Sequence, residues 1–384
     1  MKLVFVSNYF NHQQMPLCER LYSHLGKDFI FLATKPMREE RKKLGYGMDS
    51  LPEYVICAYD IEKDREMCLE LVDQADVVIF GSAPESLIKD RIKKSKIVIR
   101  YSERPLKNGF SYLKYLPRFL KWHSENPYNK PVYMLCASAY TAYDYSRFFL
   151  FKNRMFKWGY FPEVKNHNTD ELLSQKEEKT ILWCGRFIDW KHPDDVLIMA
   201  KKLTDSGKEF KVKFIGTGEM ESILSDKCKE LNLEDRVELL GSMPPSEVRK
   251  NMEKAQIYVA TSDFKEGWGA VVNEAMSSCC AVVASHAMGS VPFLIKNNEN
   301  GLIYESGNVE ELTKKVGYLL DNSDECKRIG KNAYASIADT WNAKTAADRL
   351  LTLISGIIEG KDMSFPDGPC SRSAVIKNCW LNRM

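Results

Sequence analysis

The chain of 384 residues contains no apolar run of the roughly 18 residues that a bilayer-spanning helix requires. Its first strand-like run, residues 2–6, is soon interrupted by Asn8 and Asn11, so we expect no signal peptide. The eleven cysteines are odd in number and none forms a Cys-x-x-Cys pair, which argues against a disulfide framework and against a zinc cluster. We therefore expect reduced, mostly buried thiols in a cytoplasmic protein.

Motifs of several other protein classes are missing as well. No Gly-x-Gly-x-x-Gly follows a strand-like run, which excludes a nicotinamide dehydrogenase. No Asp-x-Asp and no His/Cys cluster offers ligands to a divalent ion, so we expect neither a metal nor another cofactor. Residues 89–157 hold 16 basic and 4 acidic residues, but no nucleic-acid recognition motif accompanies this charge, and nucleic acid is not an expected partner.

What is present indicates two α/β domains. The length suits two hydrophobic cores, and 44% apolar with 28% charged residues is typical of a globular protein. Strand-like runs that are continuously apolar, as in parallel sheets covered on both faces, alternate with helical patterns. These runs occupy residues 3–6, 29–32, 77–80, 97–99 and 133–136, and, after a polar stretch at 162–179, residues 180–184, 210–215, 237–240, 256–260 and 281–284. The pattern predicts two doubly wound domains joined by a linker at 162–179.

The most informative segment carries two glutamates, Glu266 and Glu274, eight residues apart. Glu266 is followed by Gly267-Trp268-Gly269, between the strand-like run at 256–261 and a helical pattern at 270–276. A glycine-rich turn between a strand and a helix directs backbone N–H groups and the positive helix end toward a phosphate. Two carboxylates near it can accept hydrogen bonds from sugar hydroxyls, so the segment predicts a nucleotide-sugar site.

Three further strand ends carry residues suited to the same ligand, and ligands of doubly wound sheets bind at these ends. After the run at 180–184 come Arg186 and Lys191, which can both reach a diphosphate. After the run at 210–215 comes Gly216-Thr217-Gly218, a turn that lets a nucleoside approach the backbone closely. After Leu240 comes Gly241-Ser242-Met243, where a flexible apolar side chain can cover a base.

Taken in order, these pieces resemble the donor domain of the family 4 retaining glycosyltransferases. They are Gly185-Arg186…Lys191, Gly216-x-Gly218, Leu240-Gly241, Glu266-Gly267-Trp268-Gly269, Glu274-Ala275-Met276 and Asn300-Gly301-Leu302, over about 120 residues. The resemblance implies the GT-B fold, two facing Rossmann-like domains with a cleft between them. It makes residues 1–163 the N-terminal, acceptor-side domain and 164–340 the donor domain, with 341–384 forming a helix that returns to the first domain and a tail. Trp268 stands where the family commonly has Phe, and Phe293 where it frequently has Glu.

The resemblance also implies roles for individual residues. Arg186 and Lys191 would stabilise the leaving nucleoside diphosphate in place of a metal ion, and Glu266 would hold hydroxyls of the transferred sugar. Backbone N–H groups of Trp268, Gly269 and Ala270 would hold the diphosphate, and Glu274 the ribose. The expected catalytic residues are Arg186, Lys191 and Glu266, and the expected donor-binding residues are Gly185, Gly216, Gly218, Met243, Gly267, Trp268, Gly269, Ala270 and Glu274.

The function that follows is a retaining hexosyltransferase. It would move a hexose-type sugar from a UDP- or GDP-type donor to a glycan or lipid-linked acceptor in cell-surface polysaccharide synthesis. Two alternatives stay open: a sugar-nucleotide epimerase of the same fold, and a non-catalytic nucleotide-sugar-binding protein. In the first domain, His12 follows the first strand, and Glu103 stands where family members often carry a histidine that contacts the donor sugar. Both are candidate contacts to phosphate or acceptor.

Two runs in the first domain, residues 110–123 and 148–161, interleave aromatic side chains with cations. Such runs suit the boundary between headgroups and acyl chains of an anionic membrane. They predict peripheral attachment to the cytoplasmic face of the membrane. The alternative is two ordinary amphipathic helices with solvated charges, and Pro117 is expected to weaken the first of them.

Overall fold

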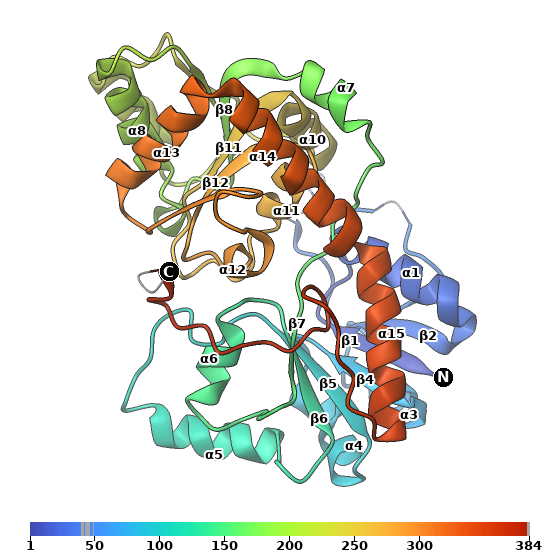
Figure 1. Ribbon diagram of the computed structural model, residues 1–384. Helices are drawn as coiled ribbons and strands as arrows, with labels where there is room; N and C mark the ends of the chain where they lie inside the picture. Colours follow the sequence, from blue (N-terminus) through green and yellow to red (C-terminus); the bar gives the residue numbers. More distant parts are fainter. Residues whose placement is uncertain (40–41, 43–46, 49, 382–384) are drawn as a thin grey trace. The chain divides into compact units, whose positions relative to one another are not determined.

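The computed structural model describes residues 1–39, 42, 47–48 and 50–381 of the chain. The chain divides into two compact units, each with its own parallel sheet and hydrophobic core (Figure 1). The first unit consists of Met1–Glu163 and Ala343–Lys377, and the second of Val164–Asn342 and the described residues from Asn378 onward. The chain therefore passes between the units three times.

The first unit contains a seven-stranded parallel sheet in the order β3-β2-β1-β4-β5-β6-β7. Its strands are β1 (Leu3–Ser7), β2 (Phe29–Ala33), β3 (Val55–Cys57), β4 (Val77–Phe80), β5 (Ile97–Ser102), β6 (Val132–Cys136) and β7 (Met155–Lys157). The α-helices described are α1 (Met15–Leu25), α3 (Arg65–Gln74), α4 (Lys89–Lys93), α5 (Tyr115–Glu125), α6 (Thr141–Ser146) and α15 (Ala343–Glu359). Every residue of β1 and β4 is buried, because helices and loops cover both faces of these central strands.

The chain after Asn342 completes the first unit. Helix α15 packs against α1, where His24 Nε2 lies 2.9 Å from Asp348 Oδ1. The tail then runs along β7, the edge strand. Lys157 N donates to Ser371 O, and Ser373 N donates to Met155 O at 3.0 Å. An edge strand that would expose unpaired backbone groups is thereby covered by the chain's own tail.

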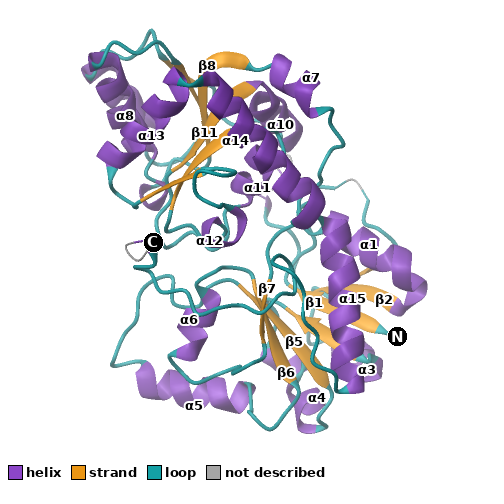
Figure 2. Ribbon diagram, viewed as in Figure 1, coloured by secondary structure: helices purple, strands orange, loops and turns teal. Residues whose placement is uncertain are grey.

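The second unit contains a six-stranded parallel sheet in the order β10-β9-β8-β11-β12-β13. Its strands are β8 (Glu177–Cys184), β9 (Lys211–Ile215), β10 (Val237–Leu239), β11 (Ala255–Ala260), β12 (Ala281–Ser285) and β13 (Leu302–Tyr304). Its α-helices are α7 (Thr169–Ser174), α8 (Pro193–Asp205), α9 (Glu221–Glu230), α10 (Pro245–Lys254), α11 (Ala270–Met276), α12 (Val291–Leu294), α13 (Val309–Asp321) and α14 (Ser323–Ala335). Figure 2 shows the strands of each unit gathered in one sheet with helices around it.

The prediction of two doubly wound α/β sheets is confirmed. Both sheets have the strand order of a Rossmann fold, in which the first strand lies beside the second on one side and the fourth on the other. The strands β3, β7 and β13 were not predicted. The polar stretch predicted as a linker holds α7, which Asn168 caps, and the first residues of β8.

The two aromatic and basic runs have different structures. Residues 148–161 contain β7, and their bulky side chains are core: Phe148, Phe151, Phe156, Trp158 and Phe161 are all buried. The prediction that this run presents aromatics to a membrane is wrong, since only Phe149 of its aromatics is largely exposed. The other run forms α5, which begins at Tyr115. Pro117 falls in its first turn, where a missing N–H breaks no helical hydrogen bond.

Candidate active site

The predicted donor residues gather at one place in the second sheet. Strand β8 lies between β9 and β11, so the order of the chain reverses between β8 and β11. Ligands of doubly wound sheets bind at the carboxyl ends of the strands beside such a reversal. The loop 185–191 follows β8 there, and the loop 261–269 follows β11. All four predicted segments therefore lie at the carboxyl edge of neighbouring strands.

Lys191 and Glu266, which the sequence suggests separately, are bonded to each other. Lys191 Nζ donates to Glu266 Oε2 at 2.6 Å, and each side chain is 13% exposed. Ser262 Oγ donates to the same oxygen at 3.1 Å. Thr261 Oγ1 donates to the backbone oxygen of Lys191 and accepts a bond from Trp183 Nε1 at 2.9 Å. Lys191 is thus held at its backbone oxygen by Thr261 and at its ammonium group by Glu266, the latter in a charge-assisted bond of the strong class.

Arg186 stands apart from this network. Its side chain is exposed, and it has no ion-pair partner among the described residues. Trp190, which the sequence does not single out as functional, lies near both cations. The Arg186 guanidinium carbon is 5.9 Å and Lys191 Nζ 4.9 Å from the centre of the Trp190 ring. The two positive groups therefore share one aromatic neighbour at the end of β8.

The loops after β8 and β9 interlock through backbone hydrogen bonds. Phe187 N donates to Thr217 O at 2.9 Å, and Gly185 N donates to Ile215 O at 3.0 Å. Gly216 has φ +142°, and a Cβ there would lie 1.8 Å from the backbone oxygen of Gly185. The close approach of the two loops requires glycine at position 216, whereas the sequence analysis expected this glycine to let a nucleoside approach the backbone. Gly218 lies in the same turn.

The turn Gly267-Trp268-Gly269 is anchored from within. Trp268 is fully buried, and its Nε1 donates to Asn273 Oδ1 at 2.8 Å. Gly269 has φ +86° at the start of α11, where a Cβ would lie 2.5 Å from Met288 Cε. Ala270 is the first residue of α11. Because the Trp268 side chain points into the core, only the backbone of this turn is left to face a ligand, and the first N–H groups of a helix have no intrahelical acceptor.

Glu274 lies on α11 in a setting of low polarity. Burial raises the pKa of its carboxyl, and the positive charge of Arg249 opposes this shift. Its charge in turn helps burial raise the pKa of the Cys184 thiol to about 12. Tyr258 Oη donates to Cys184 O at 3.1 Å beside it. The carboxylate therefore sits just below the carboxyl end of β8, where it is poorly solvated.

Arg249 is a residue that the sequence analysis missed. It lies on α10, which packs against α11, and its Nε and Nη2 are buried without a hydrogen-bond partner in the described part of the chain. Nothing in the polar helix around it distinguishes this arginine from solvated charges. Met243 is tied to the same helix, since Asn251 Nδ2 donates to Met243 Sδ at 3.6 Å.

The candidate contacts of the first unit lie at the carboxyl edge of its own sheet. His12 is in the turn between β1 and α1, where Asn11 Oδ1 accepts from Gln13 N at 2.9 Å. Glu103 follows β5, and Tyr160 Oη donates to its Oε1 at 2.7 Å. The strand β4 separates β1 from β5, so the two residues flank one strand end.

One group of potential metal ligands occurs in the described ranges, directly after Lys191. Ligand atoms of His192, Asp194 and Asp195 lie within 4.8 Å of one another. Two of these three residues already have ion-pair partners. Lys227 Nζ is 3.2 Å from Asp194 Oδ2, and His192 Nε2 is 3.7 Å from Asp263 Oδ2. A lysine ammonium in contact with one ligand disfavours a bound cation at this place.

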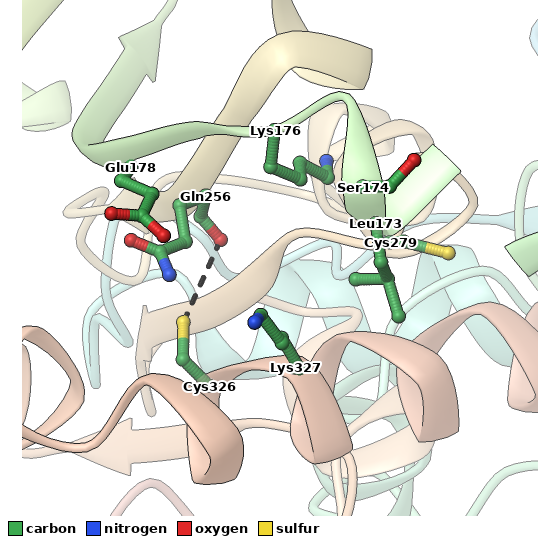
Figure 3. Close-up of a pocket in the computed structure, with 8 residues that line it drawn as sticks. All are labelled: Leu173, Ser174, Lys176, Glu178, Gln256, Cys279, Cys326 and Lys327. Atoms are coloured by element: carbon green, nitrogen blue, oxygen red, sulfur yellow. Dashed lines mark hydrogen bonds between the residues drawn. The ribbon is translucent and has the colours of Figure 1, made fainter. Parts of the chain in front are cut away.

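The second unit also has a pocket at the opposite edge of its sheet (Figure 3). It is lined by Leu173, Ser174, Lys176, Glu178, Gln256, Cys279, Cys326 and Lys327, which lie near the amino ends of β8, β11 and β12. Cys326 Sγ lies 3.9 Å from Gln256 O. Burial raises the pKa of the Cys279 and Cys326 thiols to about 12, so neither is a nucleophile at neutral pH. This pocket is therefore separate from the donor residues.

Comparison with proteins of known structure identifies the fold. The HepE protein of Anabaena, solved with UDP, superposes with a TM-score of 0.69 at 14% identity over 93% of this chain and 100% of that one. The lipopolysaccharide outer core galactosyltransferase WaaB superposes with a TM-score of 0.65 at 15% identity over 94% of this chain and 99% of that one. With the two Rossmann-like sheets, these likenesses confirm the predicted GT-B fold.

Sequence relatives are similar to about half of this chain. An uncharacterised glycosyltransferase of Haemophilus influenzae is 31% identical over 172 residues, 44% of this chain and 48% of the relative. The poly(ribitol-phosphate) alpha-N-acetylglucosaminyltransferase of Staphylococcus aureus is 25% identical over 192 residues, 50% of this chain and 38% of the relative. The chain thus spans about half the length of the curated relatives it matches, or less. Residues 164–336, which hold every predicted donor-binding residue, match the family model of glycosyl transferases group 1.

Proposed function

We propose that the protein is a retaining glycosyltransferase that moves a hexose-type sugar from a nucleoside-diphosphate sugar to a glycan or lipid-linked acceptor. One observation carries the proposal: Arg186, Lys191 and Glu266 gather at the chain reversal of the second sheet, with Glu274 beneath them. Two cations and two carboxylates at one strand edge match the diphosphate and the two polyols of such a donor. The UDP bound in the HepE structure supports a UDP-type donor here.

The geometry gives Lys191 and Glu266 complementary tasks. A lysine ammonium has three donors, so Lys191 can keep its bond to Glu266 and still donate to a phosphate oxygen. Among the described residues, Glu266 Oε2 takes the bonds from both Lys191 and Ser262, and Oε1 is left to accept from a sugar hydroxyl. The bond between the two side chains thereby fixes the sugar relative to the leaving phosphate.

Arg186 acts on the leaving group. Its exposed guanidinium is free of ion pairs within the described residues and can turn its planar fork onto the diphosphate. As the glycosidic bond breaks, negative charge grows on the leaving oxygen, and two fixed cations stabilise it. We therefore propose that no metal ion is needed. The leaving phosphate oxygen takes the proton of an acceptor that attacks from the same face, which retains the anomeric configuration.

The acceptor and its location belong to the same proposal. The name of the Staphylococcus aureus relative, a poly(ribitol-phosphate) transferase, supports a cell-surface polymer as the product. His12 and Glu103 are the proposed contacts on the acceptor side. Work on such a polymer fits the cytoplasmic face of an anionic membrane. In the described part of the chain, no helix is both long and apolar enough to cross a bilayer.

A panel of nucleoside-diphosphate sugars tests the function. We expect slow release of nucleoside diphosphate from one donor without acceptor, and faster release with the right glycan or lipid-linked acceptor. Lys191→Ala should lower this turnover by about 10²–10³-fold. Lys202→Ala on α8, whose lysine pairs with Glu310 away from the strand ends, is the matched control and should leave turnover intact. An epimerised donor would indicate the epimerase, and binding without turnover for any acceptor would indicate the non-catalytic alternative.

A further inference from the structure

The surface of the first unit carries a ridge of exposed apolar side chains, formed by α5 and the loop before it. Leu113 is 94%, Leu116 63% and Leu120 62% exposed, and Tyr112 next to them is 86% exposed. Leu116 and Leu120 are four residues apart on α5 and so lie on the same side of the helix, and Leu113 is exposed in the turn just before it. Single exposed leucines are ordinary on protein surfaces, but an ordered row of them marks an interaction surface.

The opposite side of α5 explains why the row is rigid. Tyr115 stacks on Phe148 with ring centres 5.0 Å apart, and Trp122 meets the same ring at 4.7 Å. His123 Nε2 lies 2.9 Å from Phe148 O. The aromatic side chains of α5 thus pack against the core, and the leucines are left outward because no further element covers them in the described structure.

The charges around the leucines are of one sign. Residues 104–124 contain no aspartate or glutamate. Lys107, Lys114 and Lys121 are exposed, and the nearest carboxylate to Lys121 is Glu125, 3.7 Å away at the end of the helix. The ridge is therefore apolar along its crest and positive on its flanks.

We propose that Tyr112, Leu113, Leu116 and Leu120 form a docking surface for an anionic lipid membrane, with Lys114 and Lys121 on the headgroups. The leucines would enter the boundary between headgroups and acyl chains, while the lysine stems lie along them and carry their ammonium groups to lipid phosphates. This inference goes beyond the donor chemistry, because it concerns only the first unit and needs no catalytic step.

A lipid surface fits this ridge better than a second protein does. Protein interfaces are depleted of lysine at their centre, since burying an unpaired ammonium is costly. A symmetric dimer through the ridge would also bring Lys114 and Lys121 of two copies together, and like charges oppose such contact. A membrane avoids both costs, because the ammonium groups stay in the wet headgroup layer.

Co-sedimentation with vesicles tests the proposal. Vesicles of phosphatidylcholine with a third phosphatidylglycerol should bind the protein at low salt and release it at high salt, and pure phosphatidylcholine should not bind it. The variant Leu113→Ser/Leu116→Ser/Leu120→Ser should lower binding by on the order of tenfold or more. Lys114→Glu/Lys121→Glu should lower it by well over tenfold, since each cation contributes roughly fivefold on an anionic leaflet.

The controls separate the ridge from general effects. Ile223→Ser, at a 55% exposed isoleucine of the second unit, should bind vesicles like the unchanged protein. Circular dichroism and donor turnover in vesicle-free buffer should be unchanged in the ridge variants, so failure here is distinguishable from failure of the proposed enzyme. Absence of vesicle binding at low salt, or binding that survives the triple serine change, would overturn the proposal. Concentration-dependent dimers that the serine changes abolish would assign the ridge to a second copy instead.

Discussion

The bond between Lys191 and Glu266 allows stability and catalysis to be separated. Lys191→Met removes the ammonium group and keeps most of the side-chain volume. At an effective dielectric constant of about 20, unit charges 2.6 Å apart attract by about 6 kcal/mol. Desolvation of two side chains that are 13% exposed offsets most of this gain. In Lys191→Met, Ser262 still donates a hydrogen bond to the Glu266 carboxylate, which has lost its ion-pair partner. We therefore expect a loss of about 2–3 kcal/mol in unfolding free energy.

The loss of kcat in Lys191→Met has a different origin, so a second substitution that restores stability should not restore kcat. Loss of one preorganised charge at a leaving group lowers kcat by about 10²–10³. Adding Glu266→Gln to Lys191→Met removes the unpaired charge and should restore the unfolding free energy to within about 1 kcal/mol. Turnover should stay low in this double variant. Arg186→Ala should lower kcat to a similar extent with almost no effect on stability, because Arg186 is exposed and unpaired among the described residues.

Two assays decide the matter together. Urea unfolding followed by fluorescence gives the free energies, and steady-state release of nucleoside diphosphate at saturating donor gives kcat. If the double variant is as unstable as Lys191→Met, the unpaired charge of Glu266 is not the cause of the lost unfolding free energy. Turnover within threefold of normal in both Lys191→Met and Arg186→Ala would refute their role at the leaving group.

Three further predictions concern the metal, the buried carboxylate and the interlocked loops. Donor turnover should persist in excess EDTA, and complete loss that Mg²⁺ or Mn²⁺ restores would place a functional cation, with His192 and its neighbours as the first candidates. Because burial raises the pKa of Glu274, its ionised form weakens the fold above that pKa. Glu274→Gln should therefore raise Tm at pH 8, by an increment that shrinks toward pH 4, and should weaken nucleotide binding. A lower Tm at pH 8 would contradict this prediction. Gly216→Ala should prevent soluble expression or lower Tm by more than about 5 °C, since its Cβ would overlap Gly185 O, and an unchanged Tm would show that the loops yield.

The sequence predicted the central strands because they are buried on both faces. The five residues of β1 and of β12 are all apolar or small and all buried, so no polar residue interrupts their pattern. The missed strands β3, β7 and β13 have three residues each and lie at sheet edges. Pairing with a neighbour, rather than composition, makes these short runs strands, although β10, which is equally short and also at an edge, was predicted from the run at 237–240.

Composition alone could not separate the two aromatic and basic runs. Both interleave rings with cations, yet Phe148 and Trp158 are core, whereas Leu113 and Leu116 are exposed. The difference arises from tertiary packing: β7 joins the sheet beside β6, while α5 contributes only one side to the core. The hydrophobicity of a side chain makes burial favourable, but tertiary packing determines whether that side chain is buried.

The candidate site was predictable in its segments but not in its bonds. Glycines and charges at four strand ends indicated a common ligand, since the carboxyl ends of parallel strands meet at one edge. The bond from Lys191 to Glu266 joins residues 75 positions apart, and no local pattern encodes it. Arg249 was missed for the same reason, because Glu274, whose pKa it affects, lies on a different helix. Trp190 lies in the same loop as Arg186 and Lys191, but its residue type did not distinguish it from a tryptophan used in packing.

The proposed function requires the carboxyl edge of the second sheet to bind a nucleoside diphosphate. The most direct test is a crystal structure with UDP or GDP bound. We predict that the diphosphate contacts Arg186, Lys191 and the backbone at Gly269, and that Glu274 accepts hydrogen bonds from the ribose hydroxyls. A nucleotide bound elsewhere, with Lys191 and Glu274 touching no part of it, would show that this edge is not the donor site.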